Sequence, residues 1–190
     1  MKRRAELEAE TRRRITEKAV ELHGTLGPAR TSISAIAERA GVRRSTVYRH
    51  FPDEAALFDA CSSHWEAANP VTDMTAWQSI EDPSQRLRTA LDELYAYYRR
   101  TERMMDNLHR DELTVPLVAE RFAGYHGYIA ATRDLMMRGR SVRGRRRDVA
   151  RAAVGHTLAY TTWRSLTREQ GLADDNAVAL MCAMVEGATR

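Results

Sequence analysis

Hydrophobic residues recur along the chain at the three- and four-residue spacing of amphipathic helices. A first helix is predicted over residues 8–23, with an apolar stripe of Ile15, Ala19, Leu22 and Leu26. The pairs Glu8–Arg12 and Glu10–Arg14 are four residues apart and are expected to support it. No alternating Val, Ile and Thr run is bounded by turn residues, so the pattern predicts an all-α fold of about nine helices.

Several short helices are predicted to follow this first one. Gly24, Gly27 and Pro28 interrupt the helical pattern, and Thr31 and Ser32 are candidate N-caps for a second, short helix. That helix carries Ile33, Ile36, Ala37 and Ala40 and ends at Gly41, and the stretch RRSTVYRHF (43–51) follows. A fourth helix is expected to start near Pro52 and Asp53. Two short helices joined through a glycine are typical of a helix-turn-helix.

Longer amphipathic segments occupy the chain from Pro83 onward. Their inward stripes are predicted to be Leu87, Leu91, Leu94 and Tyr98; Val118, Phe122, Tyr125, Ile129, Thr132 and Met136; Val149, Ala153, His156, Tyr160 and Trp163; and Val178, Met181 and Val185. The basic stretch GRSVRGRRR (139–147) is interpreted as a solvated connector between two of them.

The composition of the 190 residues, with 43% hydrophobic and 29% charged, is that of an ordinary globular protein. Cys61 and Cys182 lack metal-ligand spacing, which favours a reducing compartment. The basic N-terminus has no apolar run after it, and no segment approaches the roughly 20 apolar residues of a membrane span. We therefore expect a cytoplasmic protein without a membrane partner.

Charge is distributed unevenly along the sequence. Residues 1–51 contain 12 lysines or arginines against 6 glutamates, whereas the rest of the chain contains 18 against 20 acidic residues. This asymmetry indicates a polyanionic partner for the N-terminal quarter. The preference for arginine favours bidentate phosphate or guanine contacts, although codon usage would explain it equally well. Residues 1–14 hold six basic residues, which suits either an arm along DNA or a frayed, solvated helix start.

The stretch 43–51 has few apolar side chains to bury and many polar and basic side chains to expose. Val47 and Phe51 are four residues apart and are expected to point inward, whereas Ser45, Thr46, Arg49 and His50 fall on the opposite side. Such side chains bind phosphates and base edges in the major groove. This stretch is therefore interpreted as a DNA-recognition helix.

Residues 31–60, TSISAIAERAGVRRSTVYRHFPDEAALFDA, resemble the tetracycline-repressor (TetR) family of bacterial regulators. Residues 161–181 are more loosely similar to the last helices of many members. The resemblance implies a helix-turn-helix DNA-binding domain (1–52) and a helical ligand-binding and dimerisation domain (53–190).

The resemblance also implies roles for individual residues. It implies DNA contacts in the major groove or at phosphates for Ser32, Ser34, Arg44, Ser45, Thr46, Tyr48, Arg49 and His50. The family usually has a phosphate-binding lysine just inside the fourth helix, where this chain has Glu54. Either that anchor is missing, or Arg43 and the N-terminal arginines replace it.

Aromatic, histidine and methionine side chains share the inward faces of the later helices. Such positions are usually core, but they are also typical of a small-molecule cavity. The candidate effector-binding residues are Tyr95, Tyr98, His109, Phe122, Tyr125, His126, His156, Tyr160 and Trp163. Ala152, Gly155 and Ala159 form a small face suited to close helix approach, which predicts a homodimer interface with the final helix.

Enzymatic function is the competing class. The chain has no Glu-x-x-His, His-Glu-x-x-His, P-loop, dinucleotide fingerprint or zinc-type Cys/His spacing, so no catalytic residue, metal or cofactor is expected. The favoured prediction is a repressor that binds a palindromic double-stranded DNA operator and is released by an unidentified small-molecule effector. A constitutive DNA-binding protein or activator without an effector is the alternative.

Overall fold

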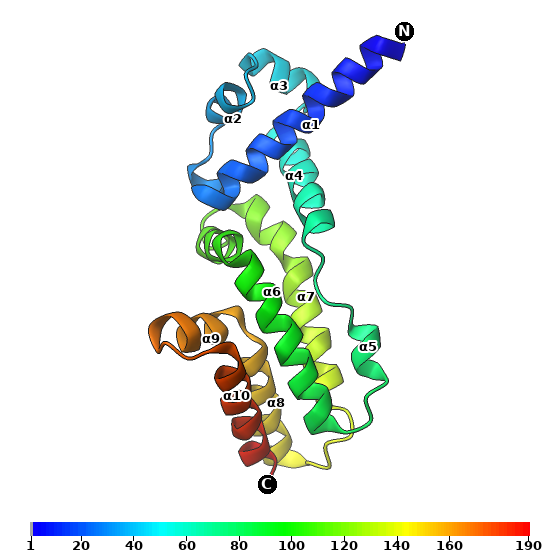
Figure 1. The fold of residues 1–190 in the computed structure, drawn as a ribbon, viewed down its shortest axis with the longest axis vertical. Helices are drawn as coiled ribbons and strands as arrows, with labels where there is room; N and C mark the ends of the chain where they lie inside the picture. Colours follow the sequence, from blue (N-terminus) through cyan, green and yellow to red (C-terminus); the bar gives the residue numbers. More distant parts are fainter. Residues whose placement is uncertain (1) are drawn as a thin grey trace. The chain divides into compact units, whose positions relative to one another are not determined.

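The helical periodicity of the sequence is realised throughout the computed structural model, which describes residues 2–190 (Figure 1). Within these residues the chain forms ten α-helices and two short helical turns, and no strand. The elements are α1 (Lys2–Thr25), η1 (Pro28–Arg30), α2 (Ile33–Arg39), α3 (Arg44–His50), α4 (Glu54–Ala68), α5 (Met74–Gln78), α6 (Pro83–Asp111), α7 (Pro116–Met137), α8 (Gly144–Leu158), α9 (Tyr160–Arg164), η2 (Ser165–Glu169) and α10 (Asp174–Thr189). The predicted all-α fold is confirmed, with one helix more than the expected nine or so.

The chain divides into two units. The first unit contains the chain up to Pro70 together with Glu102–Ala123, and the second contains Val71–Thr101 and Gly124–Arg190. The division falls inside α6 and α7, so both long helices contribute to both units.

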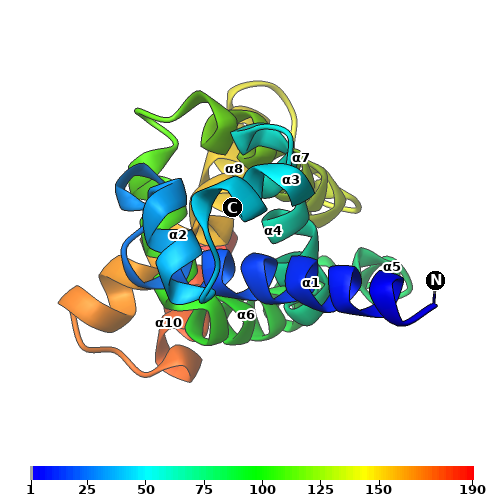
Figure 2. The same ribbon diagram turned by 90° about the horizontal axis from the view of Figure 1, so that it is seen from above.

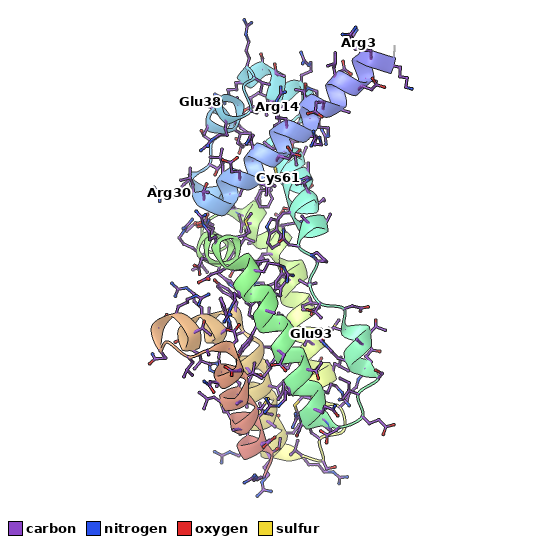
Figure 3. The ribbon with its side chains drawn as sticks, in the orientation of Figure 1. Arg3, Arg14, Arg30, Glu38, Cys61 and Glu93 are labelled. Atoms are coloured by element: carbon purple, nitrogen blue, oxygen red, sulfur yellow. The ribbon has the colours of Figure 1, made fainter. Side chains whose placement is uncertain are left out.

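The core of the first unit forms around α1, which packs on α2, α3 and α4 (Figure 2). Ile15, Ala19 and Leu22 are buried as predicted, and they meet side chains of the three shorter helices. Figure 3 shows Cys61 of α4 facing α1, where its thiol lies 3.8 Å from the Thr16 carbonyl. The predicted burial of Leu26 is wrong, because α1 ends at Thr25 and leaves this side chain 38% exposed.

Helix α1 starts at Lys2, so the N-terminal basic residues lie on a continuous helix from that residue onward. The predicted pairs Glu8–Arg12 and Glu10–Arg14 do not form. Glutamates of α1 bind other arginines instead, in the pairs Arg4–Glu8, Arg13–Glu10 and Arg13–Glu17. Arg12 and Arg14 turn away from α1 toward the helix-turn-helix.

The loop after α1 is held by the last turn of α6. Asn107 donates to the carbonyls of His23 and Gly24 at 2.9 and 3.0 Å, and Asp111 accepts from the Ala29 N–H at 2.9 Å. Gly27 has a φ of +92°, and a Cβ there would overlap the Arg110 guanidinium. This position therefore requires glycine on both conformational and steric grounds.

The second unit is built from the inward stripes of α6, α7 and α10. The α6 and α10 stripes are buried as predicted, and on α7 Thr132 and Met136 are fully buried. Trp77 of α5 is also fully buried, and its indole N–H donates to Glu93 of α6 at 3.0 Å.

The segment 149–166, predicted as one helix, is two. Ala159 adopts an extended conformation (φ −72°, ψ 135°) that separates α8 from α9. The predicted stripe through Val149 and His156 is therefore wrong: Val149 is 49% exposed and His156 is exposed. The buried face of α8 instead comprises Ala150, Val154, Thr157 and Leu158.

Among residues 2–190, no helix has both the length and the apolarity that crossing a bilayer requires. Within the same residues, no three His, Cys, Asp or Glu side chains lie together as a metal site would need. Cys61 and Cys182 are both free and buried, and burial raises the pKa of the Cys61 thiol to about 12.

Candidate DNA-binding surface and aromatic cluster

Local sequence signals shape the turn between α2 and α3. Ser32 caps α2, because its hydroxyl oxygen accepts from the Ala35 N–H at 3.1 Å. Gly41 has a φ of +64°, and the N–H of Val42 returns to the Ala37 carbonyl at 2.9 Å. The left-handed glycine lets α3 leave at an angle to α2, as in a helix-turn-helix.

Helix α3 buries one side and presents the other. Val47 and Phe51 are each 1% exposed and anchor α3 in the core of the first unit. We call the exposed set the α3 surface: Arg43, Arg44, Ser45, Tyr48 and Arg49. Arg43 and Arg49 form no ion pair within residues 2–190. The surface therefore carries uncompensated positive charge and hydroxyl groups, as a groove-binding helix requires.

Arg44 and Tyr48 support one another on this surface. A guanidinium N–H of Arg44 donates to the Tyr48 hydroxyl at 3.1 Å, and the guanidinium carbon lies 5.5 Å from the ring centroid. The pKa of Arg44 is raised, chiefly by this hydrogen bond and least by the nearby Glu54 carboxylate. The contact orders two neighbouring side chains of the α3 surface.

Two residues predicted to face outward, Thr46 and His50, are only partly exposed. The His50 Nε2 atom is buried and has no hydrogen-bond partner within residues 2–190. The pKa of His50 is lowered, first by burial and then by the charges of Arg49 and Arg12, which keeps the ring neutral near pH 7. His50 therefore packs at the edge of the α3 surface rather than at its centre.

Ser34 and Glu54 lie on the exposed faces of their helices. Ser34 is free to face a phosphate, whereas the Ser32 hydroxyl is engaged as the cap of α2. Asp53 caps α4 by accepting from the Ala56 N–H at 2.7 Å, and this places Glu54 at the first helical position. A carboxylate at this position suits the helix dipole but not a neighbouring phosphate.

Sequence reasoning missed Arg12 and Arg14. Arg14 donates from Nε to the Ala40 carbonyl at 3.0 Å, and Figure 3 shows it where α1 passes the α2–α3 pair. Arg12 donates to the His50 carbonyl and lies 4.1 Å above the Phe51 ring. No local signal distinguishes these arginines, because their i,i+4 glutamates offered a simpler explanation.

Five of the nine candidate effector-binding residues come together in the second unit. We call Tyr95, Tyr98, Tyr125, Tyr160 and Trp163 the aromatic cluster. The Tyr98 ring lies 5.3 Å from Tyr160, edge to face, and 6.0 Å from Trp163. Tyr125 joins through its hydroxyl, 2.8 Å from that of Tyr98.

The cluster satisfies the backbone at the break between α8 and α9. Tyr95 donates to the Thr157 carbonyl at 2.9 Å, and Tyr98 donates to the Leu158 carbonyl at 2.6 Å. Because one hydroxyl has a single proton, Tyr125 must be the donor to Tyr98. Burial raises the pKa of both Tyr95 and Tyr98, so their hydroxyls remain protonated near pH 7.

The other four candidates lie elsewhere. His109 and Phe122 form an edge-to-face pair at 4.9 Å in the first unit. His126 and His156 are exposed, so their predicted inward orientation is wrong. His156 turns outward because the buried face of α8 passes through Val154, Thr157 and Leu158.

The helix-turn-helix part of the chain is similar to known bacterial regulators. Residues 15–61 match the family model described as bacterial regulatory proteins, tetR family. The HTH-type transcriptional regulator AcrR of Shigella flexneri is 42% identical over 67 residues, which are 35% of this chain. The match spans only 30% of that curated relative.

Solved structures extend the likeness of fold to nearly the whole chain. A TetR family transcriptional regulator, PfmR from Thermus thermophilus, is 19% identical with a TM-score of 0.65, over 90% of this chain and 94% of its own. A TetR-like transcriptional regulator from a Rhodococcus species is 19% identical with a TM-score of 0.64, over 93% of each chain. At these identities the similarity concerns the fold alone.

Proposed function

We propose that the chain is a bacterial regulatory protein of the tetR family that represses transcription by binding a palindromic DNA operator as a homodimer, until a small-molecule effector releases it. The observation that carries the proposal is the α3 surface, with its exposed arginines and hydroxyls on a helix anchored by Val47 and Phe51. The protein has no catalytic step in this function and acts in the cytoplasm, where the operator is.

Residues 1–52 form the DNA-binding domain in this proposal, and residues 53–190 form the effector-binding and dimerisation domain. Bases and phosphates are contacted by Arg43, Arg44, Ser45, Thr46, Tyr48 and Arg49, with Ser32, Ser34 and His50 at the edges. Symmetry explains the palindrome, since two copies of α3 enter successive major grooves roughly 34 Å apart.

The dimer interface is proposed on α8 and α10, which pack together. Each helix leaves a face of small or apolar side chains open to solvent. On α8 this face includes Ala152 and Val149, which is 49% exposed, with Gly155 half-buried; on α10 it includes Ala179, Leu180, Ala183 and Gly187. Small residues permit close helix approach, so two such pairs suit a four-helix contact. A wild-type protein that sediments as a monomer at micromolar concentration would contradict this interface.

An apolar or aromatic effector is proposed to act at the aromatic cluster, where Tyr98 and Trp163 offer ring faces. Tyr98 and Tyr95 hold the broken end of α8 by its carbonyls, so an effector that engages their hydroxyls would change that end. It releases DNA only to the extent that it binds the released state more tightly than the DNA-bound state.

A second candidate, a constitutive DNA-binding protein or activator without an effector, is favoured by one observation. The hydroxyls of Tyr95 and Tyr98 are already bound within the protein. A screen of small aromatic metabolites by thermal shift, followed by operator release, separates the two. Ligands that stabilise the protein and release DNA support the first candidate.

The decisive experiment for DNA recognition is selection of bound duplexes from a random pool by the full-length protein. We expect an enriched palindrome with half-sites one helical turn apart. The matched control carries Arg44→Ala and Arg49→Ala together, and enriches no palindrome. Absence of any enriched sequence with the wild type would overturn the proposal.

A further inference from the structure

Two arginines of α1 reach across to the ends of the helix-turn-helix. Arg14 donates from Nε to the carbonyl of Ala40, the C-cap residue of α2, at 3.0 Å. Arg12 donates to the carbonyl of His50, the last residue of α3. Each short helix is thus tied to α1 at its C-terminal end.

These contacts are ones that a short helix needs. The last carbonyls of a helix lack intrahelical partners and carry its negative dipole end, so they favour a cationic donor. Arg12 adds a second contact, because its guanidinium lies 4.1 Å above the ring of Phe51, which is 1% exposed. The planar group therefore binds a backbone carbonyl and an aromatic face at the same time.

Arg13 provides a matched contrast on the same helix. Its guanidinium binds Glu10 and Glu17, so both ion pairs lie within α1. Removing it changes the charge as much as removing Arg12 does, but leaves the ends of α2 and α3 untouched.

We propose that Arg12 and Arg14 are positioning residues for DNA recognition, which fix α3 against α1 and thereby set where its side chains enter the groove. The inference rests on the proposed DNA-binding function. It gives two of the N-terminal arginines a role different from the phosphate-binding arm that their charge suggests. The lowered pKa of His50, to which the Arg12 charge contributes after burial and Arg49, agrees with this close approach.

The test is a titration of full-length protein on fluorescent duplexes, one carrying the selected operator and one of random sequence, over a range of salt concentrations. Arg12→Ala is expected to weaken operator binding about tenfold, equivalent to ~1.4 kcal/mol. Binding to random DNA and its salt dependence stay near wild type, since no phosphate contact is lost. Arg14→Ala behaves similarly, and Arg13→Ala changes little on either duplex.

A phosphate-binding role for Arg12 predicts a different result. Both duplexes would then bind more weakly by the same factor, and the slope of log affinity against log salt would fall by about 0.9. That outcome overturns the inference while leaving the proposed function intact. So does wild-type operator affinity in Arg12→Ala. A wild-type protein that prefers no sequence overturns the proposed function itself.

Two further variants separate positioning from general unfolding. Arg12→Lys keeps the charge and a donor but loses the planar contact with Phe51, so an intermediate loss of operator preference is expected. The pair Arg12→Ala and Phe51→Leu, measured alone and together on the operator, should be non-additive because both remove one contact. Additive effects of the two substitutions would contradict the role of the stacked guanidinium. So would an Arg12→Lys variant that has the wild-type melting temperature and the wild-type operator preference.

Discussion

The α3 surface and the aromatic cluster both contain tyrosines, but the first is exposed to solvent and the second is mostly buried. Tyr48 is 38% exposed and binds its neighbour Arg44 one helical turn away, whereas Tyr98 is fully buried and binds a carbonyl 60 residues away. The first tyrosine can be removed without opening the core, but the second cannot. The side chains of the α3 surface are therefore local and replaceable, whereas those of the aromatic cluster are also part of the fold.

The same contrast extends to ionisation. The α3 surface presents arginines to solvent, whereas burial raises the pKa of Tyr95 and Tyr98, so their hydroxyls stay protonated even well above neutral pH. A ligand at the cluster would therefore meet ring faces and neutral hydroxyls. DNA would meet positive charge.

The largest difference between the two regions is expected on truncation of their tyrosines. Tyr98→Ala should lower the free energy of unfolding by about 3–5 kcal/mol, because it leaves a cavity and an unsatisfied Leu158 carbonyl. Tyr48→Ala should change it by less than about 0.5 kcal/mol while weakening operator binding. Urea unfolding with parallel DNA titration measures both. Equal stability losses would mean that the regions do not differ as described.

A buried histidine in the first unit sharpens the contrast with the exposed arginines. His23 is 9% exposed, and burial lowers its pKa from 6.5 to about 4, opposed in part by Asp111. His23 binds a proton near pH 6.5 in the unfolded chain but only near pH 4 in the folded chain, so the free energy of unfolding is not reduced by this group above pH 6.5. It should fall by about 3 kcal/mol as the pH approaches 4.

Urea unfolding at about pH 7.5 and about pH 4.5 measures this loss, with His23→Leu as the control that lacks the titrating group. The variant should lose less stability than wild type over the same interval. An identical loss in both proteins would show that other groups govern acid unfolding.

The next largest effect is expected from the arginines of the α3 surface. Arg44→Ala or Arg49→Ala should reduce the preference for one operator base pair by ~1–3 kcal/mol, if that arginine reads guanine. Competition titrations with single-base operator variants measure it. Should both variants weaken every sequence equally, these arginines bind phosphate and not bases.

The smallest predicted effect concerns Glu54 beside this surface. Glu54→Lys should lower stability by ~0.3–1 kcal/mol through the helix dipole, yet tighten binding to operator and random DNA alike. The slope of log affinity against log salt should steepen by about 1, as for one more neutralised phosphate. An unchanged slope would place this side chain away from the DNA backbone.

The sequence by itself determined the helix-turn-helix. The serine cap, the left-handed glycine and the inward pair Val47 and Phe51 all act through residues a few positions apart. Such preferences depend on local backbone conformation and on the spacing of apolar residues along a helix, and both can be read from the sequence. The exposure of Arg43, Arg44 and Arg49 followed from the same period.

Only the tertiary structure decided the partners of Arg12 and the break at Ala159. Arg12 leaves Glu8, four residues away, for a carbonyl 38 residues away, because packing of α1 on α3 brings that carbonyl and the Phe51 ring within reach. Ala159 has high helix propensity, yet α8 ends before it, and the tyrosine hydroxyls of α6 satisfy carbonyls at the break. A hydrogen bond between segments far apart in the chain has no signature in the local sequence. The sequence therefore indicated which residues were aromatic or basic, whereas the fold decided what they bind.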